Sequence, residues 1–179
     1  MKNDRFTDFD DEVKQLVLDF ERTVMRGEMQ FYDIDELEMI IDYYLEVDDK
    51  EPLISALHLA ERLYPDSIEI KIRRAHWYVL NKDNARALSL LQALERQDPS
   101  DTDVFYSLAV VYGEMGESEK AISYYLRAAK DGWQLGRIYA NIAEEYVRMK
   151  NWHEAIQYYL KAFGTDSYEE YVLYNYLDT

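Results

Sequence analysis

The sequence predicts an all-α fold, an α-solenoid of four helical hairpins with an N-terminal capping helix and an extra C-terminal helix. Two observations predict it. Apolar and small residues recur at helical spacing through most of the 179 residues. The same pattern also returns with a fixed period of about 34 residues, a spacing that we call the repeat length. The pattern is clearest in residues 102–169. Its members there are Phe105, Leu108, Ala109, Tyr112, Ala121, Tyr125 and Ala128, then Tyr139, Ile142, Ala143, Tyr146, Ala155, Tyr159 and Ala162.

Residues 8–26 are expected to form the first helix, because apolar residues form one stripe along it and acidic residues face away. Together with a short connector this helix makes up residues 1–33. Repeat arrays need a cap over the exposed face of the first repeat, and we expect this segment to supply it. Phe31 and Tyr32 of the connector are expected to pack against that repeat.

The repeats are predicted at residues 34–67, 68–101, 102–135 and 136–169. Each is expected to contain two helices of about 13 residues, separated by turn-prone clusters. These clusters fall at residues 47–50, 81–83, 115–117 and 149–151. Alanines that recur at one place in each helix would let the two helices of a hairpin approach closely. Residues 170–179 are expected to form a C-terminal helix or a truncated fifth repeat.

The composition narrows the classes of function. The chain has no cysteine, and we see no secretory signal and no run of apolar residues long enough for a membrane span. These features favour a cytoplasmic protein. The net charge is −16, and residues 1–69 hold 20 Asp and Glu against 7 Lys and Arg. Such a chain repels nucleic acid and anionic membranes, so a partner recognised through charge would be basic. The simpler interpretation is that the acidic faces keep the array soluble.

The repeated positions resemble the tetratricopeptide repeat (TPR) family, whose pattern places aromatic, small and leucine residues at these intervals. The third and fourth repeats match best. The second departs at Lys71 and Arg74, where the family has apolar residues, which suggests that its first helix is shifted or rotated. The resemblance covers residues 34–169. It implies a superhelix whose first helices line a concave groove that binds peptide segments.

Transferred to this sequence, the resemblance places eight candidate binding residues in the groove. They are Glu38, Asp42, Arg73, His76, Tyr106, Val110, Arg137 and Asn141. Some family members hold a chaperone C-terminal carboxylate with a clamp of Lys, Arg and Asn. Glu38 and Asp42 stand where that clamp has a cation and an asparagine, so an acidic chaperone tail is disfavoured. Tyr106 is the most prominent candidate, with Arg73, Arg137 and Asn141 as polar candidates around it; the alternative is that Tyr106 only shields a neighbouring helix.

The sequence contains few candidate residues for catalysis or metal binding. The three histidines, His58, His76 and His153, lack the spacing of metal ligands. No glycine-rich phosphate loop and no activated nucleophile are visible. We therefore expect neither a cofactor nor a metal, and we do not expect an enzyme.

The C-terminal residues are unusually apolar for the end of a repeat array. We expect them to mediate self-association, for example as a homodimer. The residues concerned are Tyr168, Tyr171, Leu173, Tyr174 and Leu177. Two hypotheses on function remain open. The first is a non-catalytic scaffold that binds a peptide segment of a partner in the groove. The second is a structural module in which the groove or the C-terminal helix mediates homo-oligomerisation.

Overall fold

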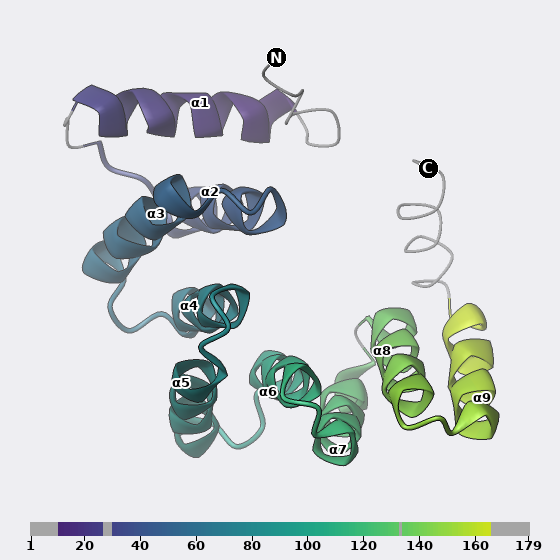
Figure 1. Cartoon of the computed structure of the whole chain (residues 1–179). Helices are drawn as coiled ribbons and strands as arrows, with labels where there is room; N and C mark the ends of the chain where they lie inside the picture. Colours follow the sequence, from purple (N-terminus) through teal and green to yellow (C-terminus); the bar gives the residue numbers. More distant parts are fainter. Residues whose placement is uncertain (1–10, 27–29, 133, 166–179) are drawn as a thin grey trace. The chain divides into compact units, whose positions relative to one another are not determined.

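The computed structural model describes residues 11–26, 30–132 and 134–165, and these residues form helices joined by short turns (Figure 1). The predicted fold class, an all-α array of helical hairpins, is confirmed. The α-helices are α1 (Asp11–Arg26), α2 (Ile34–Glu46), α3 (Lys50–Leu63), α4 (Ile68–Leu80), α5 (Asn84–Gln97), α6 (Thr102–Glu114), α7 (Ser118–Ala128), α8 (Leu135–Arg148) and α9 (Trp152–Phe163). A 3-10 turn, η1 (Ala129–Asp131), follows α7. None of the helices in these ranges has the length and apolarity that a membrane crossing requires.

The helices follow the predicted period closely. The helices α3, α5, α7 and α9 each begin one repeat length after the previous one. The turn before each of them contains one residue in the left-handed region, which reverses the chain after a helix. These residues are Asp48, Lys82, Gly116 and Lys150, with φ of 49°, 59°, 76° and 58°. Only one of the four is a glycine, although this conformation costs other residues about 1–2 kcal/mol.

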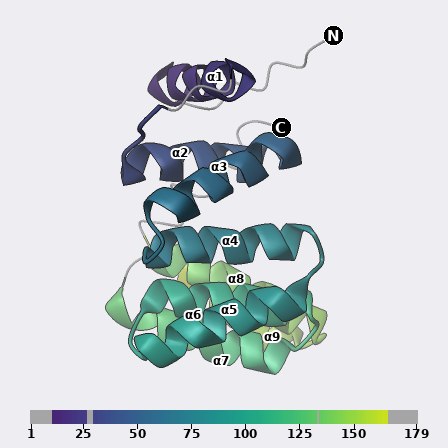
Figure 2. The same ribbon diagram turned by 90° about the vertical axis from the view of Figure 1, so that its left-hand side faces the viewer.

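The chain divides into two compact units, residues 1–77 and residues 78–179. In the first unit, α1 packs on α2 and α2 packs on α3 (Figure 2). Phe20 of α1 joins them, with its ring centroid 5.8 Å from that of Tyr32 and 6.2 Å from that of Tyr44. Tyr32 is buried as expected. The expectation for Phe31 is wrong, because 73% of this residue is exposed.

In the second unit, α5, α6, α7, α8 and α9 pack in succession. The recurring alanines are buried within the hairpins: Ala109, Ala121, Ala143 and Ala155 are at most 2% exposed. Their small side chains allow the close approach that the sequence predicts. A stacked tyrosine pair also recurs after one repeat length. The ring centroids are 5.4 Å apart for Tyr112 and Tyr124, and 5.5 Å apart for Tyr146 and Tyr158.

The expected shift of the second repeat does not occur along the chain, because α4 begins one repeat length after α2 and one before α6. Arg74 stays at its repeat position and is 7% exposed. Its guanidinium donates two hydrogen bonds of 2.6 Å to the Glu61 carboxylate and lies over the Trp77 ring. A buried charge can replace an apolar residue when it is paired in this way.

Candidate functional site

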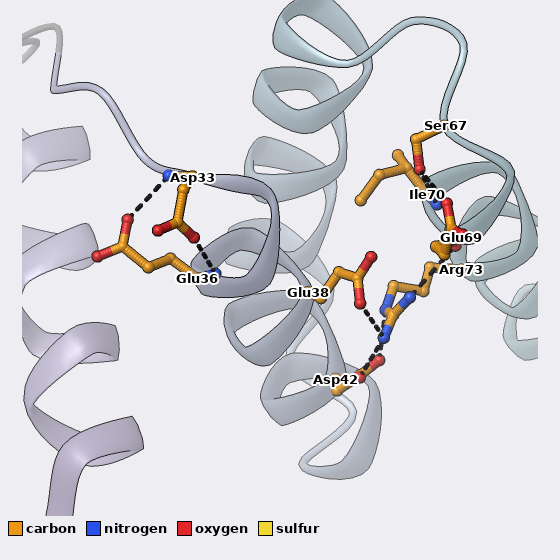
Figure 3. A network of polar contacts seen from close by, with 8 residues as sticks. All are labelled: Asp33, Glu36, Glu38, Asp42, Ser67, Glu69, Ile70 and Arg73. Atoms are coloured by element: carbon orange, nitrogen blue, oxygen red, sulfur yellow. Dashed lines mark hydrogen bonds and ion pairs between the residues drawn. The ribbon is translucent and has the colours of Figure 1, made fainter.

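In the first unit, three of the candidate residues form an ion-pair network between α2 and α4 (Figure 3). Arg73 donates to both oxygens of Asp42, with Nε–Oδ1 and Nη2–Oδ2 distances of 2.8 and 2.7 Å. Its Nη2 also lies 3.2 Å from Oε2 of Glu38. A bidentate pair of this kind fixes the orientation of the guanidinium. His76, three residues after Arg73 on α4, is half-buried.

The charges around this network shift its titration. Burial raises the pKa of Glu38; Arg73 opposes the rise, and the carboxylates of Glu69, Asp42 and Asp35 add to it. Burial would lower the pKa of Arg73, but hydrogen bonds to Asp42 and the surrounding carboxylates raise it overall. The pKa of Glu69 is lowered by a hydrogen bond from its own backbone N–H and by one from the Ser67 hydroxyl. Carboxylates thus outnumber the guanidinium on this surface.

In the second unit, α6 and α8 bring Tyr106 next to Arg137 and Asn141, which lie about one repeat length later in the sequence. The Asn141 amide donates a 2.9 Å hydrogen bond to the Tyr106 hydroxyl. The Arg137 guanidinium lies over the Tyr106 ring, 5.0 Å from its centroid. Tyr125 of α7 also contacts Tyr106, edge to face at 5.6 Å. Val110, one turn further along α6, is half-buried. The predicted grouping of Arg137 and Asn141 around Tyr106 therefore exists, whereas Arg73 is engaged by Asp42 and Glu38.

The sequence interpretation missed a buried polar cluster in the second unit. Glu145 of α8 is 3% exposed. Its carboxylate accepts hydrogen bonds of 2.7 Å from the Ser118 hydroxyl and 2.8 Å from Arg148. Arg148 also donates to the Gly113 carbonyl at 3.1 Å. The sequence did contain a signal for this cluster. Glu145 is a charged residue that stands one repeat length after the buried Val111, at a position that is apolar in the preceding repeat.

Within the described residues, no group of three or more His, Asp or Glu side chains is arranged to hold a metal ion. A half-open cavity of about 230 Å³ lies in the first unit, lined in part by Phe20, Thr23 and Tyr32 of the N-terminal segment and by His58 and Arg62 of α3. The Tyr32 hydroxyl donates to Thr23, and the Thr23 hydroxyl is 2.9 Å from Oε1 of Gln30. These polar groups serve to join the connector to α1.

The comparisons with known proteins agree with the repeat fold. The family described as "Tetratricopeptide repeat" matches residues 102–130 and 136–168. These are the segments that carry Tyr106, Arg137 and Asn141. These two segments are similar to tetratricopeptide repeats. A comparison with curated protein sequences gave no match.

Several solved structures share the fold of this chain. The thermophilic TPR protein TTC0263 of Thermus thermophilus is 21% identical with a TM-score of 0.71, covering 90% of this chain and 88% of its own. MamA of AMB-1 is 20% identical with a TM-score of 0.59, covering 84% and 88%. MamA of Desulfovibrio magneticus RS-1 is 17% identical with a TM-score of 0.59, covering 90% and 97%. At these identities the likeness concerns the fold.

Proposed function

We propose that this protein is a non-catalytic scaffold that binds a peptide segment of a partner protein on the faces of its first helices. The observation that carries the proposal is the cluster of Tyr106, Arg137 and Asn141. An aromatic ring with one cation and one amide beside it offers apolar contact together with hydrogen-bonding groups. Binding surfaces between proteins are enriched in tyrosine and arginine for this reason.

The charge of the first unit supports a neutral or basic peptide. The surface around Glu38 and Arg73 is negatively charged. Its carboxylates are those of Asp35, Glu38, Asp42 and Glu69. A lysine or arginine of a ligand would relieve the repulsion between these carboxylates, while an acidic ligand would increase it. Since such steering is screened by salt, binding is expected to weaken as ionic strength rises.

A peptide array read at several ionic strengths tests the proposal. We expect binding to basic peptides that falls with salt, is lost in Tyr106→Ala and is weakened in Glu38→Lys. Leu126→Ala is the matched control. Leu126 is 43% exposed and lies on α7, the second helix of its repeat, whereas the candidate binding residues lie on first helices. Equal binding by Tyr106→Ala and by the unmodified chain would refute the assignment of the surface.

Self-association is the second candidate function. The apolar outer face of α9 favours it, because Trp152, Ile156 and Leu160 are 59%, 57% and 61% exposed. Exposed apolar rows of this kind are often covered by another chain. The residues predicted for self-association, 168, 171, 173, 174 and 177, lie outside the described residues. Light scattering over a range of concentrations tests this candidate, and a constant monomer mass would exclude it.

A further inference from the structure

The second tyrosine of each stacked pair in the second unit lies next to a cation from its own helix. On α7, the Arg127 guanidinium lies over the Tyr124 ring, 4.8 Å from its centroid. On α9, the Lys161 ammonium lies over the Tyr158 ring, 4.1 Å from its centroid. The two pairs are one repeat length apart, and we call them the α7 cluster and the α9 cluster. They share one arrangement of ring and charge.

A carboxylate from the preceding hairpin completes the α7 cluster. Glu95 of α5 accepts a hydrogen bond of 3.1 Å from the Tyr124 hydroxyl and one of 2.7 Å from Nη1 of Arg127. In the first unit, Glu61 stands one repeat length before Glu95 and pairs with Arg74 of the following helix. At this position of the repeat the chain therefore uses a carboxylate twice to neutralise a cation that comes after it.

The α9 cluster receives no such carboxylate from the described part of the chain. The residue one repeat length after Glu95 is Ala129, in the 3-10 turn that follows α7. Among the side chains that the structure describes, no carboxylate lies within ion-pair distance of Lys161, and none accepts a hydrogen bond from the Tyr158 hydroxyl. Lys161 is exposed and Ala129 is half-buried. Alanine cannot supply the acceptor that glutamate supplies one repeat earlier.

We propose that the α9 cluster binds an acidic side chain of a partner protein, whose carboxylate takes the place that Glu95 has in the α7 cluster. The Lys161 ammonium supplies the opposite charge, and the Tyr158 hydroxyl supplies a hydrogen-bond donor. The Tyr158 ring holds the ammonium in position. Most of the negative net charge of the chain lies in residues 1–69, so the second unit repels an acidic ligand less than the first.

The position of the α9 cluster separates it from the other exposed surfaces of the second unit. By helical spacing, Lys161 lies on the opposite side of α9 from the exposed Trp152 and Phe163. The cluster also lies on a second helix, whereas the peptide candidates lie on first helices, so this site goes beyond the proposed function. Glu154 precedes Lys161 by two turns on the same side of α9 and would repel a run of acidic residues. The site therefore fits a single acidic side chain.

A nuclear magnetic resonance titration of the full chain tests the proposal. The probe is the terminally blocked tripeptide Ala-Glu-Ala, and its matched analogue is Ala-Gln-Ala, which has nearly the same shape without the charge. We expect the glutamate peptide to shift the resonances of Tyr158 and Lys161. At low ionic strength it should bind about fivefold more tightly than the glutamine peptide, and added salt should reduce this preference.

Three variants connect the preference to the α9 cluster. Ala129→Glu should abolish binding of the glutamate peptide, because it gives the cluster a carboxylate of its own at the position of Glu95. Gln97→Glu is the matched control, since it adds the same charge to an exposed residue of α5 and should leave binding intact. Lys161→Gln should remove the preference for the glutamate peptide, and its exposed position spares the fold.

The outcomes separate this site from the alternatives. Equal binding of the two peptides, or unchanged binding by Ala129→Glu, overturns the proposal. A preference that persists in Lys161→Gln also overturns it, because the carboxylate then binds elsewhere. Light scattering that shows a concentration-dependent dimer, lost in Lys161→Gln, would identify a second copy as the source of the carboxylate and overturn the assignment to a separate partner.

Discussion

Substituting Gly113 by alanine tests the buried cluster around Glu145. Gly113 lies in the last turn of α6, where an alanine would ordinarily stabilise the helix by up to about 1 kcal/mol. Here a Cβ atom would lie 2.5 Å from Oε1 of Glu145 and 3.3 Å from Nη1 of Arg148. The cluster therefore reverses the usual expectation for this substitution.

The size of the effect follows from what Glu145 must give up. Its carboxylate is held by Ser118 and Arg148, so moving it away from residue 113 weakens at least one hydrogen bond to a charged group, worth about 1.5–3 kcal/mol. Overpacking in a close-packed region costs about 1–3 kcal/mol by itself. Both costs describe the same displacement of the carboxylate, so they are not added; subtracting the gain of about 1 kcal/mol in helix propensity from about 1.5–3 kcal/mol leaves an expected destabilisation of about 0.5–2 kcal/mol.

Urea unfolding followed by circular dichroism measures this difference. The double variant Gly113→Ala with Glu145→Ala supplies the decisive comparison, because the added methyl group then has no carboxylate to meet. Its loss should be smaller than the sum of the two single losses. Gly164→Ala is the control for glycine replacement without collision, since Gly164 has φ −81° and the added Cβ would lie 3.6 Å from the nearest atom, the carbonyl oxygen of Leu160. A stabilised Gly113→Ala protein, or strict additivity in the double variant, would refute the reasoning.

Three further predictions concern stability. Lys150→Gly should stabilise the chain by about 0.5–1 kcal/mol in thermal unfolding, because Lys150 holds a φ of 58° that glycine adopts without strain. Glu61→Gln should cost about 1–3 kcal/mol in urea unfolding, because it leaves the buried guanidinium of Arg74 with a weaker partner; the partial exposure of Glu61 keeps the loss toward the lower value. Glu38→Gln should leave stability at pH 7 unchanged or higher, despite the loss of an ion pair with Arg73. The pKa of Glu38 is raised in the folded state, so protonation of Glu38 favours folding. This contribution to stability is lost as the pH rises above 4.5. The Gln variant should therefore show a flatter dependence of thermal stability on pH.

The helices could be predicted from the sequence because their positions depend on local periodicity. The repeat spacing predicted the turns before α3, α5, α7 and α9, and two of these turns contain the left-handed residues Lys82 and Lys150, whose conformation was not predicted. Neither lysine marks a turn by its own propensity. Their place in the repeat, one repeat length on either side of Gly116, carried the information.

Side-chain partners depend on packing between helices, and here the sequence said less. The repeat pattern marked Arg74 as a departure but did not show that Glu61, on the preceding helix, neutralises it. The contact of Asn141 with Tyr106 could be predicted, because both residues were assigned to the same face of successive first helices. Phe31 was mispredicted because a connector has no periodicity that distinguishes a buried aromatic residue from an exposed one.

The contacts within the candidate surface decide which groups can contribute to peptide affinity. The amide of Asn141 is already hydrogen-bonded to the Tyr106 hydroxyl, and the Arg137 guanidinium already lies over the Tyr106 ring. A ligand that binds these polar groups exchanges one partner for another, and a neutral hydrogen bond yields only about 0.5–1.5 kcal/mol net. The Tyr106 ring offers apolar area that needs no such exchange, and aromatic residues at binding hot spots contribute about 2 kcal/mol or more.

Titration calorimetry with a peptide selected from the array can separate these contributions. Tyr106→Ala should reduce affinity by about thirtyfold or more, which corresponds to about 2 kcal/mol. Tyr106→Phe keeps the ring and frees the Asn141 amide for the ligand, so its affinity should stay within about tenfold of the unmodified chain. Arg137→Ala should fall between them. Equal losses for Tyr106→Phe and Tyr106→Ala would show that the hydroxyl, and not the ring, determines binding on this surface.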